Sequence, residues 1–444
     1  MIQVVSSAWA LLLGMCLLMV GNGMQGTLLG IRGGIEGFST FQMSIVMSAY
    51  FVGFLGGSRM APGMIRRVGH VRVFAALASL ISAVMILYPT FPNTIVWSIG
   101  RVLIGFCFSA VYVTAESWLN NAATNENRGQ ALSAYMIVQT LGIVIAQALL
   151  LTADPSGFVL FVIPSVLVSI AVTPILLSIS PTPPFGTTKP MSLSTLMETS
   201  PLGCVGMFLL GGVFSAQFGM AAVYGAEAGL SVAQISLFVA AFFVGSVILQ
   251  YPIGWISDRM DRRSLIVITA LIGGAGSMVG MMLGHIFPIL LATAFVVGGM
   301  SNPLYSLIMA HTNDFLEHED MAAASGGMLF INGLGAVLGP VITGWMMGTA
   351  LGPGGFYLFT AVLFAALAGY ASYRKTQRAA VPVEDTGNYV PIYPSATAVA
   401  VEIAQEYAIE TEQEAAEEAA QESAEANKNA PDSDNYVADD IKRD

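Results

Sequence analysis

Twelve long apolar segments constrain the fold of this 444-residue chain more than any other feature. An apolar helix of about 20 residues, rising 1.5 Å per residue, spans the hydrocarbon core of a bilayer. Only 10% of the residues are charged, against about 25% in an ordinary soluble domain. We therefore expect an all-α membrane protein with twelve transmembrane helices. The segments cover 8–31, 41–61, 73–90, 95–118, 130–151, 158–180, 201–222, 233–255, 264–284, 288–311, 323–347 and 355–373.

The basic residues of the loops predict the orientation, because Lys and Arg are enriched in short cytoplasmic loops. With a cytoplasmic N-terminus, 12 basic residues lie in predicted cytoplasmic segments and Arg32 alone lies in an external loop. We therefore expect a multi-pass protein of a bacterial inner membrane with both termini cytoplasmic. The cytoplasmic set is Arg59, Arg66, Arg67, Arg72, Arg128, Lys189, Arg259, Arg262, Arg263, Arg374, Lys375 and Arg378.

The chain also matches itself at an offset of 192 to 193 residues. At 192, Phe51-Val52-Gly53 falls on Phe243-Val244-Gly245. A repeat of this length indicates two parallel six-helix halves, a plan of secondary transporters that bind solute between the halves. The pairs at 193 include Tyr112 with Tyr305, Gln139 with Asn332, and Gly142 with Gly335.

Four parts of the chain follow from these observations: an N-terminal half at 1–180, a cytoplasmic linker at 181–200, a C-terminal half at 201–378 and a cytoplasmic tail at 379–444. The linker is rich in Pro, Thr and Ser, and its prolines cannot continue the sixth helix. The tail has 16 acidic and 3 basic residues, a net charge of −13, and it lacks the leucines of a core. We expect it to be solvated and disordered, the alternative being a partner-binding or regulatory segment.

A charged signature, GWISDRMDRR at 254–263, follows the eighth apolar segment. A carboxylate flanked by arginines at this turn could clamp neighbouring helix ends in one transport state and release them in another. The equivalent loop of the first half, PGMIRRVGH at 62–70, contains Arg66 and Arg67 but no acid. The candidate gating residues of the second half are Asp258, Arg259, Arg262 and Arg263.

The signature resembles G-x-x-x-D-R-x-G-R-R of the major facilitator superfamily, with Asp261 where that family usually has Gly. The start of the fourth span, GRVLIG at 100–105, is similar to its R-x-x-x-G signature. The strings GNGMQGTLLGIRG, IRRVGHVRVFAALAS and GFCFSAVYVTAESWLNNAATNENRG look like the YcaD-like branch of this superfamily. The resemblance covers residues 8 to 375. It implies the superfamily fold and secondary transport, and it does not identify the solute.

Arg101 of the fourth span is the first candidate for the solute site. An arginine buried in a membrane is costly unless it is paired or faces water, so it indicates function. One fixed positive charge in the inner cavity favours an anionic or zwitterionic small solute. An internal acid that neutralised Arg101 would remove this preference.

Glu116 lies on the same span, 15 residues beyond Arg101. This separation is about 22 Å along a helix, so the two side chains cannot pair directly. Two interpretations remain open. Glu116 could carry a proton as its surroundings alternate between wet and dry, or it could pair with Arg59, Arg66 or Arg67 at the cytoplasmic gate.

Polar residues on the first span are further candidates. Asn22, Gln25 and Arg32 follow one another, and the last two lie within about 20° on one helical face. This face is expected to line the cavity. The alternatives are interhelical hydrogen bonding of the amides and pairing of Arg32 with Glu36.

Other spans contribute matching polar faces. Tyr135 and Gln139 lie one turn apart on the fifth span, and Asn302 and Tyr305 on the tenth. Asn332, on the eleventh span, matches Gln139 in the repeat. Each is a candidate for solute contact, with packing as the alternative.

Several classes of function lack support. The chain contains no phosphate-binding glycine loop and no G-x-S-x-G or H-E-x-x-H motif, and its three cysteines lie far apart. We expect no enzyme activity, metal, cofactor or nucleic-acid partner. The prediction is a monomeric secondary active transporter of a small solute, working by alternating access and coupled to a proton or solute gradient. The alternative is a transport-inactive membrane scaffold or sensor that recruits partners through its acidic tail.

Overall fold

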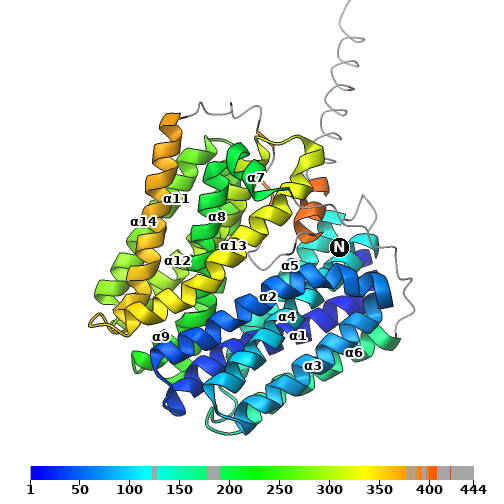
Figure 1. The fold of residues 1–444 in the computed structure, drawn as a ribbon, viewed down its shortest axis with the longest axis vertical. Coiled ribbons are helices and arrows are strands. Elements are labelled where there is room, and N and C mark those ends of the chain that lie inside the picture. Colours follow the sequence, from blue (N-terminus) through cyan, green and yellow to red (C-terminus); the bar gives the residue numbers. More distant parts are fainter. Residues whose placement is uncertain are drawn as a thin grey trace, which may run out of the picture.

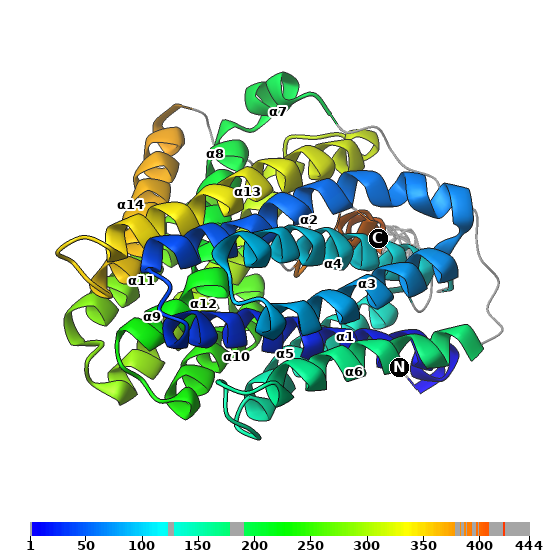
Figure 2. The same cartoon turned by 60° about the horizontal axis from the view of Figure 1, so that its bottom comes forward.

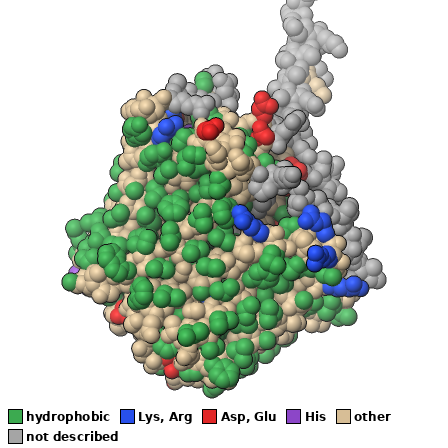
Figure 3. Space-filling model, in the orientation of Figure 1, with side chains coloured by type: hydrophobic (Ala, Val, Ile, Leu, Met, Phe, Trp, Pro, Cys, Tyr) green, Lys and Arg blue, Asp and Glu red, His purple; other side chains and the backbone are tan. Residues whose placement is uncertain are grey.

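The computed structural model describes residues 2–122, 128–177 and 191–377, together with several tail residues. Those of the tail are Pro382, Thr386, Gly387, 389–392, Thr397, 399–407 and Gln421. Within these described parts, twelve helical segments are long and apolar enough to cross a membrane, as predicted. Apolar side chains are spread across the face shown in Figure 3, and Lys and Arg gather towards its upper and right-hand parts. This surface suits a lipid environment, because a soluble protein would expose many more charges.

The first half contains six helices, all shown in blue to green in Figure 1. The second helix, at 40–68, continues seven residues beyond the predicted apolar segment at 41–61. The added turns carry Arg66 and Arg67, which are exposed, so hydropathy does not reveal them. The helices are α1 (Ile2–Ile35), α2 (Thr40–Val68), α3 (His70–Thr90), α4 (Thr94–Ala122), α5 (Arg128–Leu149) and α6 (Val159–Leu177).

The second half begins after a short linker helix, α7 (Leu193–Thr199). Its first span is interrupted: α8 (Pro201–Ser215) passes through a π-helical turn, η2 (Ala216–Met220), into α9 (Ala221–Glu227). A π-turn inserts an extra residue and changes which side chains face a neighbour. The remaining spans are α10 (Val232–Ser257), α11 (Arg262–Leu283), α12 (Phe287–Asn313), α13 (His318–Met347) and α14 (Gly354–Gln377).

The repeat seen in the sequence is also a repeat of packing. In the first half α2 packs against α4, and in the second α10 packs against α12. A Cβ on Gly53 would lie 1.9 Å from the carbonyl oxygen of Val102, and one on Gly245 would lie 2.0 Å from that of Phe295. Only glycine permits these two matching approaches of helix backbones.

The two halves meet at the end that holds the α1–α2 and α9–α10 loops, which we term the external end from its predicted orientation. There α1 packs against α9 and α2 against α13 (Figure 1). Thr40 Oγ1 donates a hydrogen bond to Glu227 Oε1 at 2.7 Å, and Ser48 Oγ donates to the Val337 carbonyl at 2.5 Å. The external end is therefore closed. At the opposite, predicted cytoplasmic end, the halves separate around a cavity.

Part of the tail enters this cytoplasmic end. Residues 399–407 form a short helix between the halves, drawn in brown in Figure 2. Val401, Ile403 and Ala404 are at most 3% exposed. The expectation of a solvated tail therefore does not hold for this stretch, because its apolar side chains are buried between the two halves. Apart from Gln421, residues 408–444 lie outside the described part of the chain.

Candidate functional site

A cavity of about 580 Å³ lies between the halves and is lined by both. Asn22 and Gln139 line it from the first half, and Asn302 and Asn332 from the second. These are four of the predicted binding residues, and the volume suits a small organic solute. Much of the remaining wall is aromatic. Its rings belong to Tyr50, Phe51, Phe54, Tyr112, Phe214, Phe218, Phe243 and Phe330.

Arg101 lies behind this wall, fully buried inside the first half. Its Nη1 donates to Gln25 Oε1 at 2.7 Å, and Gln25 Nε2 donates to Asn22 Oδ1 at 3.2 Å. Asn22 Nδ2 then donates to the hydroxyl of Tyr112 at 2.8 Å. The Arg101 Cζ atom also lies 4.6 Å from the ring centre of Tyr50. Arg101 and Gln25 therefore do not line the cavity themselves, but a hydrogen-bonded chain connects them to its surface.

The charge of Arg101 has no carboxylate partner among the described residues. Its Nε and Nη2 atoms also have no hydrogen-bond acceptor within the part of the chain that the structure describes. A buried unit charge acts over a longer range than an exposed one, because the protein interior screens it weakly. The first half therefore presents a positive potential behind Tyr50.

Glu116 lies in the same helix, α4, closer to the cytoplasmic end. Its Oε1 accepts a hydrogen bond from the Tyr135 hydroxyl at 3.1 Å. Its Oε2 accepts from the backbone N–H of Thr397 at 3.3 Å and from the Thr397 hydroxyl. The suggested pairing of Glu116 with Arg59 is absent among the described contacts, since the Arg59 guanidinium lies 4.2 Å from the ring centre of Phe330. Tyr135 is thus brought to Glu116 and does not line the main cavity.

The second half supplies polar groups without a charge. Asn302 Nδ2 donates to Ser246 Oγ, and Asn332 Nδ2 donates to the carbonyl of Met207 at 3.0 Å. Tyr305 is fully buried away from the cavity, and its hydroxyl has no partner among the described residues. This wall offers amides and hydroxyls that could bind a polar but uncharged part of a solute.

The π-turn η2 contributes residues beside the cavity that the sequence analysis did not predict. Gln217 and Phe218 lie in η2; Phe218 lines the cavity, and Gln217 Oε1 accepts a hydrogen bond from Ser301 at 3.1 Å. The repeat carries a signal for Gln217, because it stands 192 residues after Gln25. Phe218 gives no such signal, since an aromatic residue in an apolar span is unremarkable.

Arg32 lies outside the cavity, near the external end. Its Nη2 forms an ion pair with Glu36 Oε1 at 2.6 Å, and its Nη1 donates to the carbonyl of Pro155 at 2.9 Å. The pairing with Glu36 that the sequence offered as an alternative is therefore present. Arg32 ties α1 to the α5–α6 loop in this conformation.

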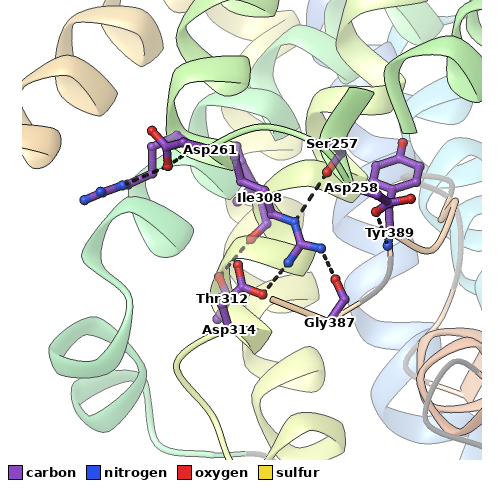
Figure 4. Close-up of polar contacts among 10 residues, drawn as sticks. Ser257, Asp258, Asp261, Ile308, Thr312, Asp314, Gly387 and Tyr389 are labelled. Atoms are coloured by element: carbon purple, nitrogen blue, oxygen red, sulfur yellow. Dashed lines mark hydrogen bonds and ion pairs between the residues drawn. The ribbon is translucent and has the colours of Figure 1, made fainter. Parts of the chain in front are cut away.

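Arg262 has the most partners among the predicted gating residues of the second half, and Figure 4 labels three of these partners, Ser257, Asp314 and Gly387. This buried side chain forms an ion pair with Asp314 and donates to the carbonyl of Gly387, and its Nε donates to Ser257 Oγ at 3.3 Å. Burial raises the pKa of Asp314 above its usual range, although Arg262 lies beside it and opposes the shift. The arginine thus joins the start of α11, the end of α12 and the tail.

Asp258 and Arg259 are exposed and have separate partners. Asp258 Oδ1 accepts the backbone N–H of Tyr389 at 2.9 Å, as Figure 4 shows. The Arg259 guanidinium lies 4.2 Å from the ring centre of Trp255. In this conformation the predicted carboxylate clamp therefore binds the tail.

Asp261, the departure from the family signature, is the N-cap of α11. Its carboxylate accepts the backbone N–H groups of Arg263 and Ser264 and the Ser264 hydroxyl, the last at 2.7 Å. Arg263 Nε also lies 3.6 Å from Asp261 Oδ1. In the first-half loop, Arg66 lines the mouth of the cavity and Arg67 is exposed.

Comparison with known proteins agrees with this arrangement. The sequence profile of the Major Facilitator Superfamily matches residues 11–201 and 203–404. The uncharacterized MFS-type transporter YcaD of Salmonella arizonae is 26% identical over 341 residues, covering 76% of this chain and 88% of YcaD.

Solved structures show the same fold. The nucleoside transporter NupG superposes with a TM-score of 0.69 at 13% identity, covering 82% of this chain and 98% of NupG. A bacterial homologue of the human lysosomal transporter Spinster, in an inward-facing and occupied conformation, also gives a TM-score of 0.69. Its identity is 15%, covering 85% of this chain and 97% of the homologue.

Proposed function

This chain belongs to the Major Facilitator Superfamily, whose members are membrane transporters rather than enzymes, and we propose that it moves a small solute by alternating access. The observation that carries the proposal is the cavity of about 580 Å³, lined by both halves. The halves pack together at the external end through α1–α9 and α2–α13. Rocking them about the cavity would expose the same residues to the other side.

The proposed solute is an anion or a zwitterion. Arg101 has no carboxylate partner among the described residues, and its contact with Gln25 connects it to Asn22 at the cavity wall. A negative group near Asn22 and Tyr50 would therefore lie in a favourable potential. Asn302 and Asn332 would bind the uncharged polar part of the same solute from the second half.

Protons are the proposed coupling ion, and Glu116 is the candidate carrier. Its carboxylate is buried in a span and accepts hydrogen bonds from Tyr135 and Thr397. If Thr397 moved away, Glu116 would lose two of these donors and gain access to water from the cytoplasmic end. Such a change in surroundings alters the proton affinity of a carboxylate.

We further propose a monomer in a bacterial inner membrane, the membrane being supported by the bacterial relatives. The Lys and Arg bias supports the proposal that both termini are cytoplasmic. Fusions of a reporter after Gly129 and after Glu227 test this orientation. The first is expected to report cytoplasm and the second the external side. A cytoplasmic signal at Glu227 would contradict the twelve-span topology.

A screen of thermal stabilisation tests the solute proposal, because a bound solute stabilises the folded protein by about 2.7 kcal/mol at 100 times its dissociation constant. Purified protein is heated with matched anionic, zwitterionic, neutral and cationic solutes of similar size. Stabilisation by anions or zwitterions is expected, followed by their uptake or efflux in proteoliposomes. Stabilisation by cations alone would contradict the role of Arg101. A solute that binds but is never transported would favour the alternative function, a transport-inactive membrane sensor.

A further inference from the structure

The described residues of the tail between Thr386 and Tyr407, which we call the C-terminal plug, bind the second half through specific hydrogen bonds. Gln250 Nε2 donates to the Tyr389 hydroxyl at 2.9 Å. Ser306 Oγ accepts the backbone N–H of Ile392 at 2.9 Å and donates to its carbonyl at 3.0 Å. Both polar groups of one plug residue are thus satisfied by a single side chain of α12.

The plug binds the first half and a second site on α13 as well. Thr397 donates to Glu116 on α4 through its N–H and its hydroxyl. A Cβ on Gly129 would lie 2.4 Å from the ring of Tyr407, so this ring packs on the α5 backbone. On α13, Ser325 Oγ accepts from Gln405 Nε2 at 3.0 Å. The plug therefore bridges the two halves at the end where they separate.

The plug also fills the space between the halves. Val401 is 0% exposed, and Ile392 and Ala400 are 5% exposed. A residual space of only about 20 Å³ remains where Glu116 and Tyr135 meet Ile392 and Ala400. Thr397, Val399 and Glu402 form part of the wall of the main cavity. The packing is that of a built interface and not of a loosely adsorbed segment.

Three gate candidates are engaged by this segment. Asp258 accepts the backbone N–H of Tyr389, Arg262 donates to the carbonyl of Gly387, and Glu116 accepts from Thr397. Asp258 and its plug partner Tyr389 are labelled in Figure 4, as is Gly387, the plug partner of Arg262. While the plug is bound, these groups cannot close the cytoplasmic end by pairing with the opposite half.

We propose that the C-terminal plug is an autoinhibitory segment that binds the open cytoplasmic cleft and holds the transporter with its external end closed. The inference rests on the proposed alternating access. Closure of the cytoplasmic end would require α4 and α5 to approach α10 and α12, and the plug occupies the space between them. α14 ends only nine residues before Thr386, so the plug is tethered and needs little intrinsic affinity to stay bound.

Thiol labelling tests the plug without any knowledge of the solute. Thr140 lines the cavity, and Thr140→Cys is introduced after Cys16, Cys107 and Cys204 are replaced by Ala. A small charged maleimide is the probe, applied to purified protein. Deletion of 386–444 is expected to accelerate labelling at least tenfold. Deletion of 408–444, which keeps the plug, is expected to leave the rate unchanged.

Point variants keep the test valid if the long deletion does not fold. Val401→Asp places a charge at a fully buried position and is expected to accelerate labelling like the deletion, whereas Val401→Ile is the matched control. Equal labelling rates in all these proteins would overturn the plug while leaving the transport proposal standing.

A cross-link tests whether the plug controls conformation. Ser306→Cys and Ile392→Cys join the plug to α12 under oxidation, and Ser48→Cys then reports opening of the external crossing of α2 and α13. We expect Ser48→Cys to be labelled slowly in the oxidised protein, and at least tenfold faster after reduction or after deletion of 386–444. If Thr140→Cys responds to the deletion but Ser48→Cys is equally slow in all forms, the plug does not regulate alternation. If Ser48→Cys stays protected even with a bound solute, alternating access itself fails.

Discussion

The two halves of the transporter share a helix plan but differ in the polarity of their interiors. The first half has a buried charge, Arg101, joined through Gln25 to Asn22 at the cavity. At the offsets of 192 to 193 the second half keeps one amide and replaces the other polar positions with rings or an alanine. The counterparts of Asn22, Gln25, Tyr50 and Arg101 are Phe214, Gln217, Phe242 and Ala294.

The predicted cytoplasmic gates also differ, but here the buried charge belongs to the second half. Arg262 of the second half is buried and has partners on α10, α12 and the tail, whereas Arg66 and Arg67 of the first half are exposed. The two halves therefore share their backbone packing, as at Gly53 and Gly245, but they differ in which buried positions carry polar or charged side chains. In the proposed site the first half supplies the buried charge, Arg101, whereas the second half supplies the buried arginine of the cytoplasmic loop, Arg262.

Substitution of Arg101 is expected to have the largest effect on this comparison. Arg101→Ala should abolish solute-dependent stabilisation, because it removes the charge behind the cavity and leaves Gln25 without its partner. Arg101→Lys keeps the charge but loses the planar fork, so we expect binding to weaken about tenfold. Dissociation constants from thermal titration measure both effects.

The matched control is Thr293→Val, beside Ala294, the counterpart of Arg101 in the second half, which should leave binding near that of the parent. All variants are first checked for folding by gel filtration and circular dichroism. Normal binding by Arg101→Gln across solute concentration and pH would show that the charge is irrelevant to the site.

Arg262→Gln is the next largest expected effect, this time on stability. It leaves Asp314 buried without its ion pair, a change that costs about 3 kcal/mol. Arg66→Gln at the exposed first-half position is expected to change stability by about 0.5 kcal/mol or less. Unfolding of purified protein in detergent measures the difference.

Adding Asp314→Asn to Arg262→Gln should recover part of the loss, because the unpaired carboxylate is then removed. Equal destabilisation by the Arg66 and Arg262 changes would contradict the difference between the two gates.

Substitutions of Gln25 and Gln217, which occupy equivalent positions in the two halves, are expected to have smaller and unequal effects on solute binding. Gln25→Leu removes the acceptor of a charged donor, Arg101 Nη1, and is expected to weaken solute binding about tenfold. Gln217→Leu removes one hydrogen bond from Ser301 and should weaken it about twofold or less. Calorimetric titration with the solute found in the screen provides the measurement, and a larger effect of Gln217→Leu would reverse the assigned roles.

The smallest expected effect is that of the helix cap. Asp261→Ala should destabilise the protein by about 1 kcal/mol at pH 7, and Asp261→Gly by a few tenths. Burial alone would raise the pKa of Asp261, but the Ser264 hydroxyl, the charge of Arg263 and two backbone N–H groups together hold it below its usual range. The cap therefore contributes fully above the unfolded pKa of about 3.9 and is lost as pH falls through the lower folded pKa.

Unfolding of the parent and Asp261→Ala at pH 7 and pH 3 measures this loss. The difference between the two proteins should shrink at the lower pH. A constant difference would show that the carboxylate charge does not contribute to the cap.

Much of the fold could be predicted because membrane spans have a strong one-dimensional signal. The twelve apolar segments correspond to twelve helical spans among the described residues. The π-turn at Ala216–Met220 could not be predicted, because it leaves the apolar run unbroken. The extension of α2 to Val68 was missed for a related reason, since hydropathy ends at the lipid boundary and the helix does not.

The site was predictable only where a polar residue interrupts an apolar span. Asn22 and Asn302 are such residues and line the cavity, as expected, whereas Tyr50 and Phe218 also line it without any signal in the sequence. The sequence identified Arg101 as a candidate because it is an arginine within a membrane span. Its position behind Tyr50 depends on the rotation of α4 about its axis, which hydropathy does not specify.

The plug was missed because average composition hides a short apolar stretch. The acidic tail as a whole predicts disorder, yet Val401 and Ala404 lie one turn apart and are both buried. Their burial depends on a cleft formed by segments that contact the plug across 80 to 281 residues of the chain, so no local pattern reveals it.

Paired distance measurements by electron spin resonance test alternating access most directly. One spin-label pair at Ile35 and Ala228 reports the external end, and another at Arg67 and Met197 reports the cytoplasmic end; all four positions are exposed. The labels are placed in protein lacking the native cysteines and residues 386–444. We predict a second population in which the external distance lengthens and the cytoplasmic distance shortens, enriched by the transported solute. A single population at both ends under every condition would contradict the proposed cycle.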